Sequence, residues 1–355
     1  MAEPRVDAMR NLVPRFIAAG VDFNDTQRLF ARLERWDDWC GEWSALAAEH
    51  ERLAEEAAAA EQWVTAGEAW LRAAVMYHFG KYLFYDHPDE YRAAHDAVQR
   101  SYRAAMPHLA WPVERVEAPY AGTVIPGTLR RPHGVARPPL VLLSHGLDAT
   151  KEEYHVFGEA FLRRGMATLG FDGPGQGELG FELKIEPAYE KVVGALLDHL
   201  AARNDLDLGR VGIVGVSLGG YYAPRAAAFE PRIRAIATVG GPYDFGDCWD
   251  HLPPGSRLAL QHNSGAPDAE ATRAFAHRLT LAGVAPRVAC PALLVHGERD
   301  TLVPPSEVRR LARELGGPVD LVLYPEGDHV CHNITYKYRP RVADWMGGQL
   351  GVPAA

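Results

Sequence analysis

A serine between glycines, followed much later in the chain by an aspartate and a histidine, could act as a nucleophile. The segment Gly215-Val216-Ser217-Leu218-Gly219 matches the pattern G-x-S-x-G, in which a tight turn from strand to helix exposes the serine hydroxyl. The match alone is weak evidence, because the chain has 34 glycines and short glycine patterns recur by accident. The alternative for Ser217 is a capping serine in a glycine-rich turn.

The serine needs a base, and the base needs an orienting carboxylate. Asp300 ends the segment LLVHGERD and His329 ends the segment YPEGDH, and each follows an apolar run that predicts a strand. Because the carboxyl ends of parallel strands meet at one edge of a sheet, we expect both side chains near Ser217. The sequence therefore predicts a triad of Ser217, Asp300 and His329. The competing acids and histidines are Glu298, Asp328, His296 and His332.

A serine nucleophile also needs donors for the oxyanion that its attack creates. The segment SHGLDATKEEY (144–154) follows an earlier predicted strand, and we expect His145 to stabilise its turn. The backbone N–H groups of Leu147 and Leu218 are the predicted oxyanion hole, and each such donor typically contributes about 3–4 kcal/mol. Asp148 and Asp244 are weaker candidates for a polar contact with the substrate, and the alternative for both is a solvated loop carboxylate.

No cofactor or metal is expected from the remaining motifs. The segment FDGPGQGE (171–178) lacks the spacing of the G-x-G-x-x-G dinucleotide fingerprint and suggests a sharp loop beside the site. His329 and His332 flank Cys331, but no further ligands with zinc spacing follow. We therefore predict a small-molecule substrate with neither a cofactor nor a metal.

Apolar strands and helical patterns alternate from residue 113 to the end of the chain. This alternation predicts an α/β fold with a mostly parallel sheet flanked by helices. The polar segment 242–288 interrupts it, as a cap insertion or as a long irregular excursion. The expected strands, some with their following loops, are 113–118, 123–129, 138–146, 166–175, 210–217, 232–241, 290–300 and 318–329. The expected helices are 154–164, 187–203, 218–229, 307–315 and 339–350.

The N-terminal part of the chain has a helical texture and predicts a separate domain over residues 1–112, ahead of a catalytic domain over 113–355. Two sets of aromatic residues recur at helical spacing. We interpret them mainly as helical core, and the alternative is that part of them covers a ligand site or forms a dimer surface. The two sets are Trp36, Trp39 and Trp43, and Trp63, Trp70 and Tyr77.

Composition excludes several classes of protein. The 355-residue chain has a formal net charge of −9, which argues against nucleic acid or an anionic membrane as a partner. Its four cysteines are widely spaced and form no disulfide framework or zinc motif, which is typical of the cytoplasm. The first residues contain no long apolar segment, so we expect no secretory signal, and no run of 18 apolar residues predicts a membrane span.

Taken together, these segments resemble the FrsA-like esterase group of the α/β-hydrolase superfamily, over nearly the whole chain. The segments that carry the resemblance are HGLDATKEE, FDGPGQGE and GVSLGGYYAPR, preceded by YHFGKYLF in the helical part. The resemblance implies that Ser217, Asp300 and His329 form the triad. It also implies that the helical domain covers the active site and contributes to a homodimer. Members of the group include hydrolases that cleave a carbon–carbon bond beside a ketone, and other members resemble plain esterases.

The resemblance leaves the substrate open at one place. The member that acts in nicotine degradation uses an additional glutamate after the strand that follows the serine turn. The corresponding stretch here is GGPYDFGDCWD (240–250), which contains three aspartates and no glutamate. We expect hydrolysis of a C–C bond in a β-diketone or an aromatic or polyketide-like acyl substrate. The alternatives are a carboxylesterase or thioesterase, and a non-hydrolytic binding or cyclisation protein on the same scaffold.

Overall fold

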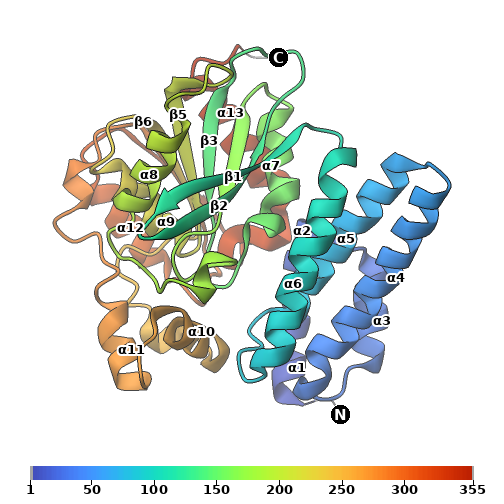
Figure 1. Ribbon diagram of the computed structural model, residues 1–355. Helices are drawn as coiled ribbons and strands as arrows, with labels where there is room; N and C mark the ends of the chain where they lie inside the picture. The colour runs from blue at the N-terminus through green and yellow to red at the C-terminus, as the bar shows by residue number, and fades with distance from the viewer. Residues whose placement is uncertain (1–2, 354–355) are drawn as a thin grey trace. The chain divides into compact units, whose positions relative to one another are not determined.

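The computed structural model describes residues 3–353, which divide into two compact units (Figure 1). The helical unit holds the described chain up to Glu114 together with Glu152–Val156, and the sheet unit holds Arg115–Lys151 and the described chain from Phe157 on. The predicted domain boundary between residues 112 and 113 stays a prediction. So do the cover and dimer roles of the helical part.

The helical unit is built on three long helices, in which α4 packs on α5 and α5 packs on α6. Its core gathers Trp39 and Trp43 around Phe16, whose ring centroid lies 5.2 Å from that of Trp43. Trp36 is buried and stacks on Trp39. However, it lies in a 3₁₀ turn that precedes α4, so the three tryptophans do not all lie on one α-helix as the spacing predicted. The helices are α1 (Pro4–Arg10), α2 (Val13–Ala19), α3 (Phe23–Arg32), α4 (Trp39–Ala59), α5 (Trp63–Lys81) and α6 (Pro88–Ala105).

The second aromatic set is core only in part. Tyr77 is buried and donates a hydrogen bond of 2.7 Å to Glu51. Trp63 is 47% exposed, Trp70 is half-buried, and both rings stack on His108. The heptad spacing places the three side chains along one side of α5, but burial decreases toward the start of that helix.

The sheet unit contains an eight-stranded sheet with the order β1-β2-β4-β3-β5-β6-β7-β8. Strand β2 runs antiparallel to β4, and the neighbours from β4 to β8 are parallel, as the continuous apolar runs predict. The strands are β1 (Val113–Tyr120), β2 (Thr123–Arg130), β3 (Pro139–Ser144), β4 (Ala167–Phe171), β5 (Asp207–Val216), β6 (Ile233–Val239), β7 (Ala292–Gly297) and β8 (Val319–Tyr324).

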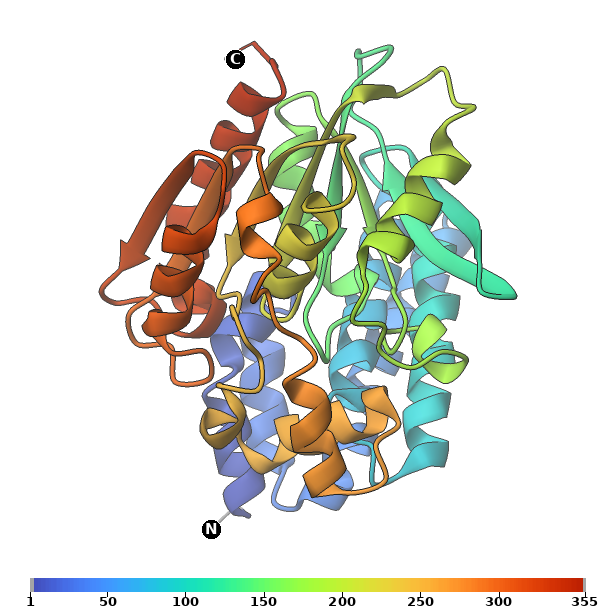
Figure 2. The same ribbon diagram turned by 90° about the vertical axis from the view of Figure 1, so that its left-hand side faces the viewer.

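Helices cover both faces of this sheet, with α8 and α9 on one face and α7 and α13 on the other (Figure 1). The polar segment 242–288 contains two helices, α10 and α11, which pack on each other (Figure 2). Helix α13 begins four residues before the expected start and contains Pro340. The helices are α7 (His155–Leu162), α8 (Glu190–Leu200), α9 (Gly219–Ala227), α10 (Pro254–Ser264), α11 (Ala269–Ala276), α12 (Pro305–Glu314) and α13 (Thr335–Gln349).

Within residues 3–353, no helix combines the length and the apolar character needed to cross a membrane. The buried strands β3 to β7 place their carboxyl ends side by side at one edge of the sheet. The candidate site is therefore assembled from the loops that leave these strands.

Candidate active site

Ser217 occupies the turn between β5 and α9 in a strained backbone conformation. Its φ is +54°, a left-handed value that is uncommon for a residue other than glycine. Gly215 and Gly219 make the turn possible, because a Cβ on Gly215 would overlap the carbonyl of Gly219, and a Cβ on Gly219 would overlap the carbonyl of Ser144. The chain therefore presents a serine hydroxyl on a tight turn from strand to helix, which is the structural context that the pattern G-x-S-x-G requires.

His329 and Asp300 lie beside this hydroxyl. The Nε2 atom of His329 is 2.9 Å from the Oγ of Ser217, and its Nδ1 atom is 2.8 Å from the Oδ2 of Asp300. The other carboxylate oxygen of Asp300 accepts the N–H groups of Leu302 and Val303, at 2.9 Å each. Burial opposes ionisation of Asp300, but the charge and hydrogen bond of His329 outweigh it and lower the pKa of the carboxyl.

Backbone strain extends beyond His329. Val330 and Cys331 have φ values of +62° and +55°, and Val330 is β-branched, so its conformation is an outlier. This turn packs against Gly240, because a Cβ on Gly240 would lie 3.0 Å from the nitrogen of Val330. Strained residues of this kind persist where the surrounding structure holds them, which here is beside a candidate catalytic histidine.

The competing acids and histidines have other partners. Glu298 forms an ion pair of 2.9 Å with Arg309, and Asp328 accepts the N–H of Asn333 at 3.4 Å. His296 donates to the carbonyl of Val303 at 2.9 Å, and burial lowers its pKa. Its Nε2 also lies 3.5 Å from the Oδ2 of Asp300, so it borders the triad without contacting Ser217 in the way that His329 does. His332 lies in the 3₁₀ turn His329–Ile334. Asp300 and His329 are the pair that the structure brings to Ser217.

The loop after β3 approaches Ser217 closely at Gly146. A Cβ on Gly146 would lie 3.1 Å from the Cβ of Ser217 and 3.5 Å from its Oγ, so the peptide group of Gly146 and Leu147 borders the hydroxyl. Leu218 immediately precedes α9, where the helix dipole favours negative charge. The structure therefore places Gly146, which precedes Leu147, and the start of α9 next to the serine.

Asp172 holds the same loop through hydrogen bonds to its two ends, and sequence reasoning did not single out this buried residue. Asp172 accepts hydrogen bonds from His145 Nε2 at 3.0 Å and from the backbone N–H and the Nζ of Lys151 at 2.9 Å each. Burial opposes its ionisation, but the charge of Lys151 and the hydrogen bond from His145 keep its pKa well below the usual value. A polar residue directly after a buried strand was the signal that could have found it.

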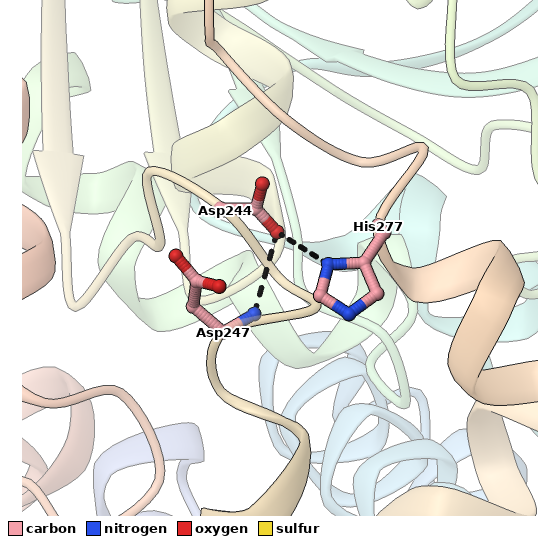
Figure 3. Close-up of side chains that lie close together, drawn as sticks. All are labelled: Asp244, Asp247 and His277. Carbon is pink, nitrogen blue, oxygen red and sulfur yellow. Dashed lines mark hydrogen bonds and ion pairs between the residues drawn. The ribbon is translucent and has the colours of Figure 1, made fainter.

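The two candidates for a polar substrate contact are placed differently. Asp148 follows Leu147 directly and is half-buried. Asp244 accepts the N–H groups of Gly246 at 2.8 Å and Asp247 at 3.3 Å, and the same oxygen lies 3.5 Å from His277 Nδ1 (Figure 3). Its side chain therefore stabilises its own turn and contacts the His277 ring.

Asp244, Asp247 and His277 together form a group that sequence reasoning missed, with potential ligand atoms within 4.8 Å of one another (Figure 3). Carboxylate and imidazole are donor types that bind divalent cations. However, Asp247 and His277 are exposed, and the turn and the contact between Asp244 and His277 already account for the grouping. We therefore assign it no metal.

Comparison with known proteins gives matches over most of the chain. The family model described as "Esterase FrsA-like" matches residues 26–245, and the model of the prolyl oligopeptidase family matches residues 157–352. The chain is 34% identical over 336 residues to 2,6-dihydropseudooxynicotine hydrolase of Paenarthrobacter nicotinovorans, covering 94% of this chain and 90% of that protein. It is 37% identical over 223 residues to 20-hydroxy-prefusarin hydrolase of Gibberella moniliformis, covering 59% and 53%.

A solved structure agrees with these matches. The crystal structure of 2,6-dihydroxy-pseudo-oxynicotine hydrolase superimposes with a TM-score of 0.88 at 33% identity, covering 96% of this chain and 97% of that chain. The predicted hydrolase fold and the resemblance proposed from the sequence are both confirmed. The chain is an α/β-hydrolase enzyme and belongs to the FrsA-like esterase family.

Proposed function

We propose that this enzyme is a serine hydrolase with Ser217 as nucleophile, His329 as general base and Asp300 as the group that orients the histidine. One observation carries the proposal: His329 lies within hydrogen-bond distance of both Ser217, at 2.9 Å, and Asp300, at 2.8 Å. Asp300 is buried and its lowered pKa keeps it ionised, so it stabilises the imidazolium that forms when the serine loses its proton.

We propose the N–H groups of Leu147 and Leu218 as the oxyanion hole. The approach of Gly146 to Ser217 supports the first donor, and the start of α9 supports the second. Backbone donors fixed by the fold need no reorganisation when charge develops, which makes them effective in the transition state.

In the proposed reaction, the Oγ of Ser217 forms a bond to the substrate carbonyl carbon while its proton moves to His329 Nε2. The tetrahedral intermediate then breaks its bond to the leaving group, which takes the electron pair. This group leaves as an alkoxide from an ester and as an enolate from a β-diketone. In both cases it takes up the proton from the imidazolium, which restores neutral His329. Water, deprotonated by His329, then attacks the acyl carbon. The bond to the Oγ of Ser217 breaks, the Oγ takes the proton back from His329, and the acyl group leaves as a carboxylic acid.

We propose a C–C bond beside a ketone as the bond that is cleaved, in a β-diketone or an aromatic or polyketide-like acyl substrate. The relatives that support this are hydrolases named for 2,6-dihydropseudooxynicotine and 20-hydroxy-prefusarin. The family description "Esterase FrsA-like" favours the alternative, an ester or thioester. The same Ser–His–Asp arrangement serves both, because the leaving group alone distinguishes them.

Asp148 and Asp244 are the proposed polar contacts with the substrate. Asp148 has the stronger support, because it adjoins the donor residue Leu147, whereas Asp244 closes its own turn. Substitution of each by asparagine, with the Michaelis constant measured for one substrate, separates them. A contact with the substrate raises the Michaelis constant, and a solvated carboxylate leaves it unchanged.

The assay that tests the proposed reaction compares β-diketones with p-nitrophenyl esters, using Ser217→Ala as control. Turnover of the diketones by the wild type and its loss in the variant support C–C hydrolysis through an acyl-enzyme. If the variant retains C–C cleavage, water activated by His329 attacks directly and Ser217 is not the nucleophile. Turnover of esters alone establishes the alternative.

We further propose that the enzyme is a cytoplasmic homodimer. The four cysteines at positions 40, 248, 290 and 331 are free thiols, as a reducing compartment favours.

On α5, Trp63 and Val64 are 47% and 69% exposed, which is unusual for neighbouring large apolar side chains. Sedimentation of the wild type and of Val64→Glu tests the dimer. A monomeric wild type contradicts it.

A further inference from the structure

Gln176 is a buried amide in the loop after β4, and all four of its hydrogen-bonding positions have partners. Its Nε2 donates to the carbonyl oxygens of His145 and Gly146, at 2.9 Å each. Its Oε1 accepts the N–H of Gly173 at 3.2 Å and the hydroxyl of Tyr189 at 3.3 Å. The residue is 3% exposed, so water cannot replace these partners, and one orientation of the amide makes all four hydrogen bonds. The side chain is therefore held rigidly and can fix the backbone groups that it contacts.

The carbonyl of Gly146 belongs to the same peptide group as the N–H of Leu147. A trans peptide is planar, and its C=O and N–H point in opposite directions. The hydrogen bond that fixes the Gly146 oxygen on the Gln176 side therefore directs the Leu147 N–H away from Gln176. This peptide group also borders Ser217, because a Cβ on Gly146 would lie 3.5 Å from the serine Oγ.

The next carbonyl in the loop is held in the same way from another element. Asn263, near the end of α10, is 5% exposed and donates its Nδ2 to the carbonyl of Leu147 at 2.8 Å. Its own carbonyl accepts the N–H of Ile185 at 2.9 Å. The peptide groups before and after the Leu147 side chain are therefore each held by a buried amide.

We propose that Gln176 is a positioning residue for the oxyanion hole, fixing the peptide group whose N–H receives the developing charge on the substrate. The proposal rests on the serine-hydrolase function proposed above. The Gly146 oxygen also lies 3.2 Å from His145 Nδ1, so without Gln176 it keeps that contact and loses the shorter bond of 2.9 Å. The peptide is then held less firmly, and its N–H can turn away from the position of the oxyanion. A donor placed in advance is what gives an oxyanion hole its effect, so the loss of orientation lowers the rate of attack on the carbonyl.

The test uses reagents that need no knowledge of the natural substrate. Diethyl p-nitrophenyl phosphate phosphorylates an active serine and releases p-nitrophenol, and its P=O oxygen occupies the oxyanion hole. The P=S counterpart places sulfur there, which is a weak acceptor. The second-order rate constants for both reagents are measured for the wild type, Gln176→Leu and Gln176→Glu. The matched control is Gln261→Glu, because Gln261 lies in α10 and its side chain bonds the carbonyl of Pro267.

We expect the Gln176 substitutions to slow the reaction with the P=O reagent more than the reaction with the P=S reagent. In both Gln176 variants the rate constant for the P=O reagent falls about 10- to 100-fold, as for a modest displacement of a catalytic group. The rate constant for the P=S reagent falls much less, so the P=O to P=S ratio decreases. Gln261→Glu keeps the wild-type ratio. Circular dichroism confirms that each variant is folded. The two variants differ in what they disturb: Gln176→Glu retains an acceptor for Gly173 and Tyr189, whereas Gln176→Leu places no charge beside the carbonyls of His145 and Gly146.

Two results overturn the proposal. If both rate constants fall by the same factor in the folded variants, Gln176 supports the fold or the nucleophile rather than the oxyanion hole. If neither falls, the peptide holds its orientation without Gln176. A wild type that reacts with neither reagent at Ser217 instead contradicts the serine-hydrolase function itself, which separates that failure from a failure at Gln176.

Discussion

The Nε2 atom of His329 lies 2.9 Å from the Oγ of Ser217, although 112 residues separate the two in the chain. Ser217 leaves β5 and His329 follows β8, with β6 and β7 between these strands in the sheet. The two residues therefore meet because the carboxyl ends of parallel strands lie at the same edge of the sheet.

Ser217→Ala should abolish covalent labelling by a fluorophosphonate probe and lower the turnover number by several orders of magnitude, on the order of 10⁴–10⁶. The fold should survive, because the backbone contact of Ser217 with Val239 is unaffected. Labelling is followed by mass spectrometry. Ser264→Ala, at the end of α10, is the control and should label like the wild type. Undiminished labelling of Ser217→Ala would place the nucleophile elsewhere.

Asp300→Asn should lower the turnover number by about 10⁴-fold, because the imidazolium of His329 loses its partner and its orientation. Glu298→Gln tests the competing acid and should change the turnover number less than about threefold, because Glu298 is paired with Arg309 at the surface. Both variants are assayed with one p-nitrophenyl ester. The opposite order of effects would assign the acid to Glu298.

Asp172→Asn should lower the free energy of unfolding at pH 7 by about 3–5 kcal/mol, because it removes one partner of a buried ion pair with Lys151. The folded-state pKa of Asp172 lies below its unfolded value of about 3.9. Its contribution is therefore present above about pH 3.9 and is lost as the pH falls through the folded-state pKa.

Urea denaturation at pH 7 and at pH 3 measures this dependence, and the gap between the wild type and Asp172→Asn should narrow at the lower pH. Asp198→Asn is the matched control, since its 74%-exposed carboxylate pairs with Arg232 at the surface. The control should change the free energy of unfolding by less than about 1 kcal/mol. An equal effect of the two substitutions would contradict a special role for Asp172.

Substitution by alanine should change the stability of the protein in opposite directions at two glycines. Gly215→Ala should unfold the protein or lower its stability by more than about 3 kcal/mol, because the new Cβ overlaps the carbonyl of Gly219 in the serine turn. Gly41→Ala, inside α4 with open space around it, should raise stability by about 0.5–1 kcal/mol. Thermal unfolding of both variants checks the signs.

The thiols should be unreactive in the folded protein. Burial raises the pKa of Cys40 to about 11 and that of Cys331 to about 12, so little thiolate exists at pH 8. Titration with a disulfide reagent should modify these two thiols slowly in buffer and rapidly in denaturant. Rapid modification of either in the native protein would show that its surroundings open on that timescale.

Much of the site is predictable from the sequence because its residues carry local signals. Ser217 lies among glycines, and Asp300 and His329 each follow an apolar run, so strand ends and chain order suffice to nominate them. The parallel sheet follows from the same runs, which are apolar on both faces because helices cover both. The aromatic spacing around Trp39 and Trp43 predicted helical core in the same way, and these two side chains are buried there.

Other features depend on which loops meet, and local patterns do not encode that. Glu153 lies in the segment that joins the helical unit, where its carboxylate forms two hydrogen bonds with Arg15, 138 residues away, and one with His78. Asp172 and Gln176 look like ordinary polar residues of a glycine-rich loop until the loop after β3 packs against them. The sequence alone nominated the proposed reacting groups, because each follows its own strand. The tertiary structure decided what holds them in place, because buried hydrogen bonds form between segments that approach only in the folded chain.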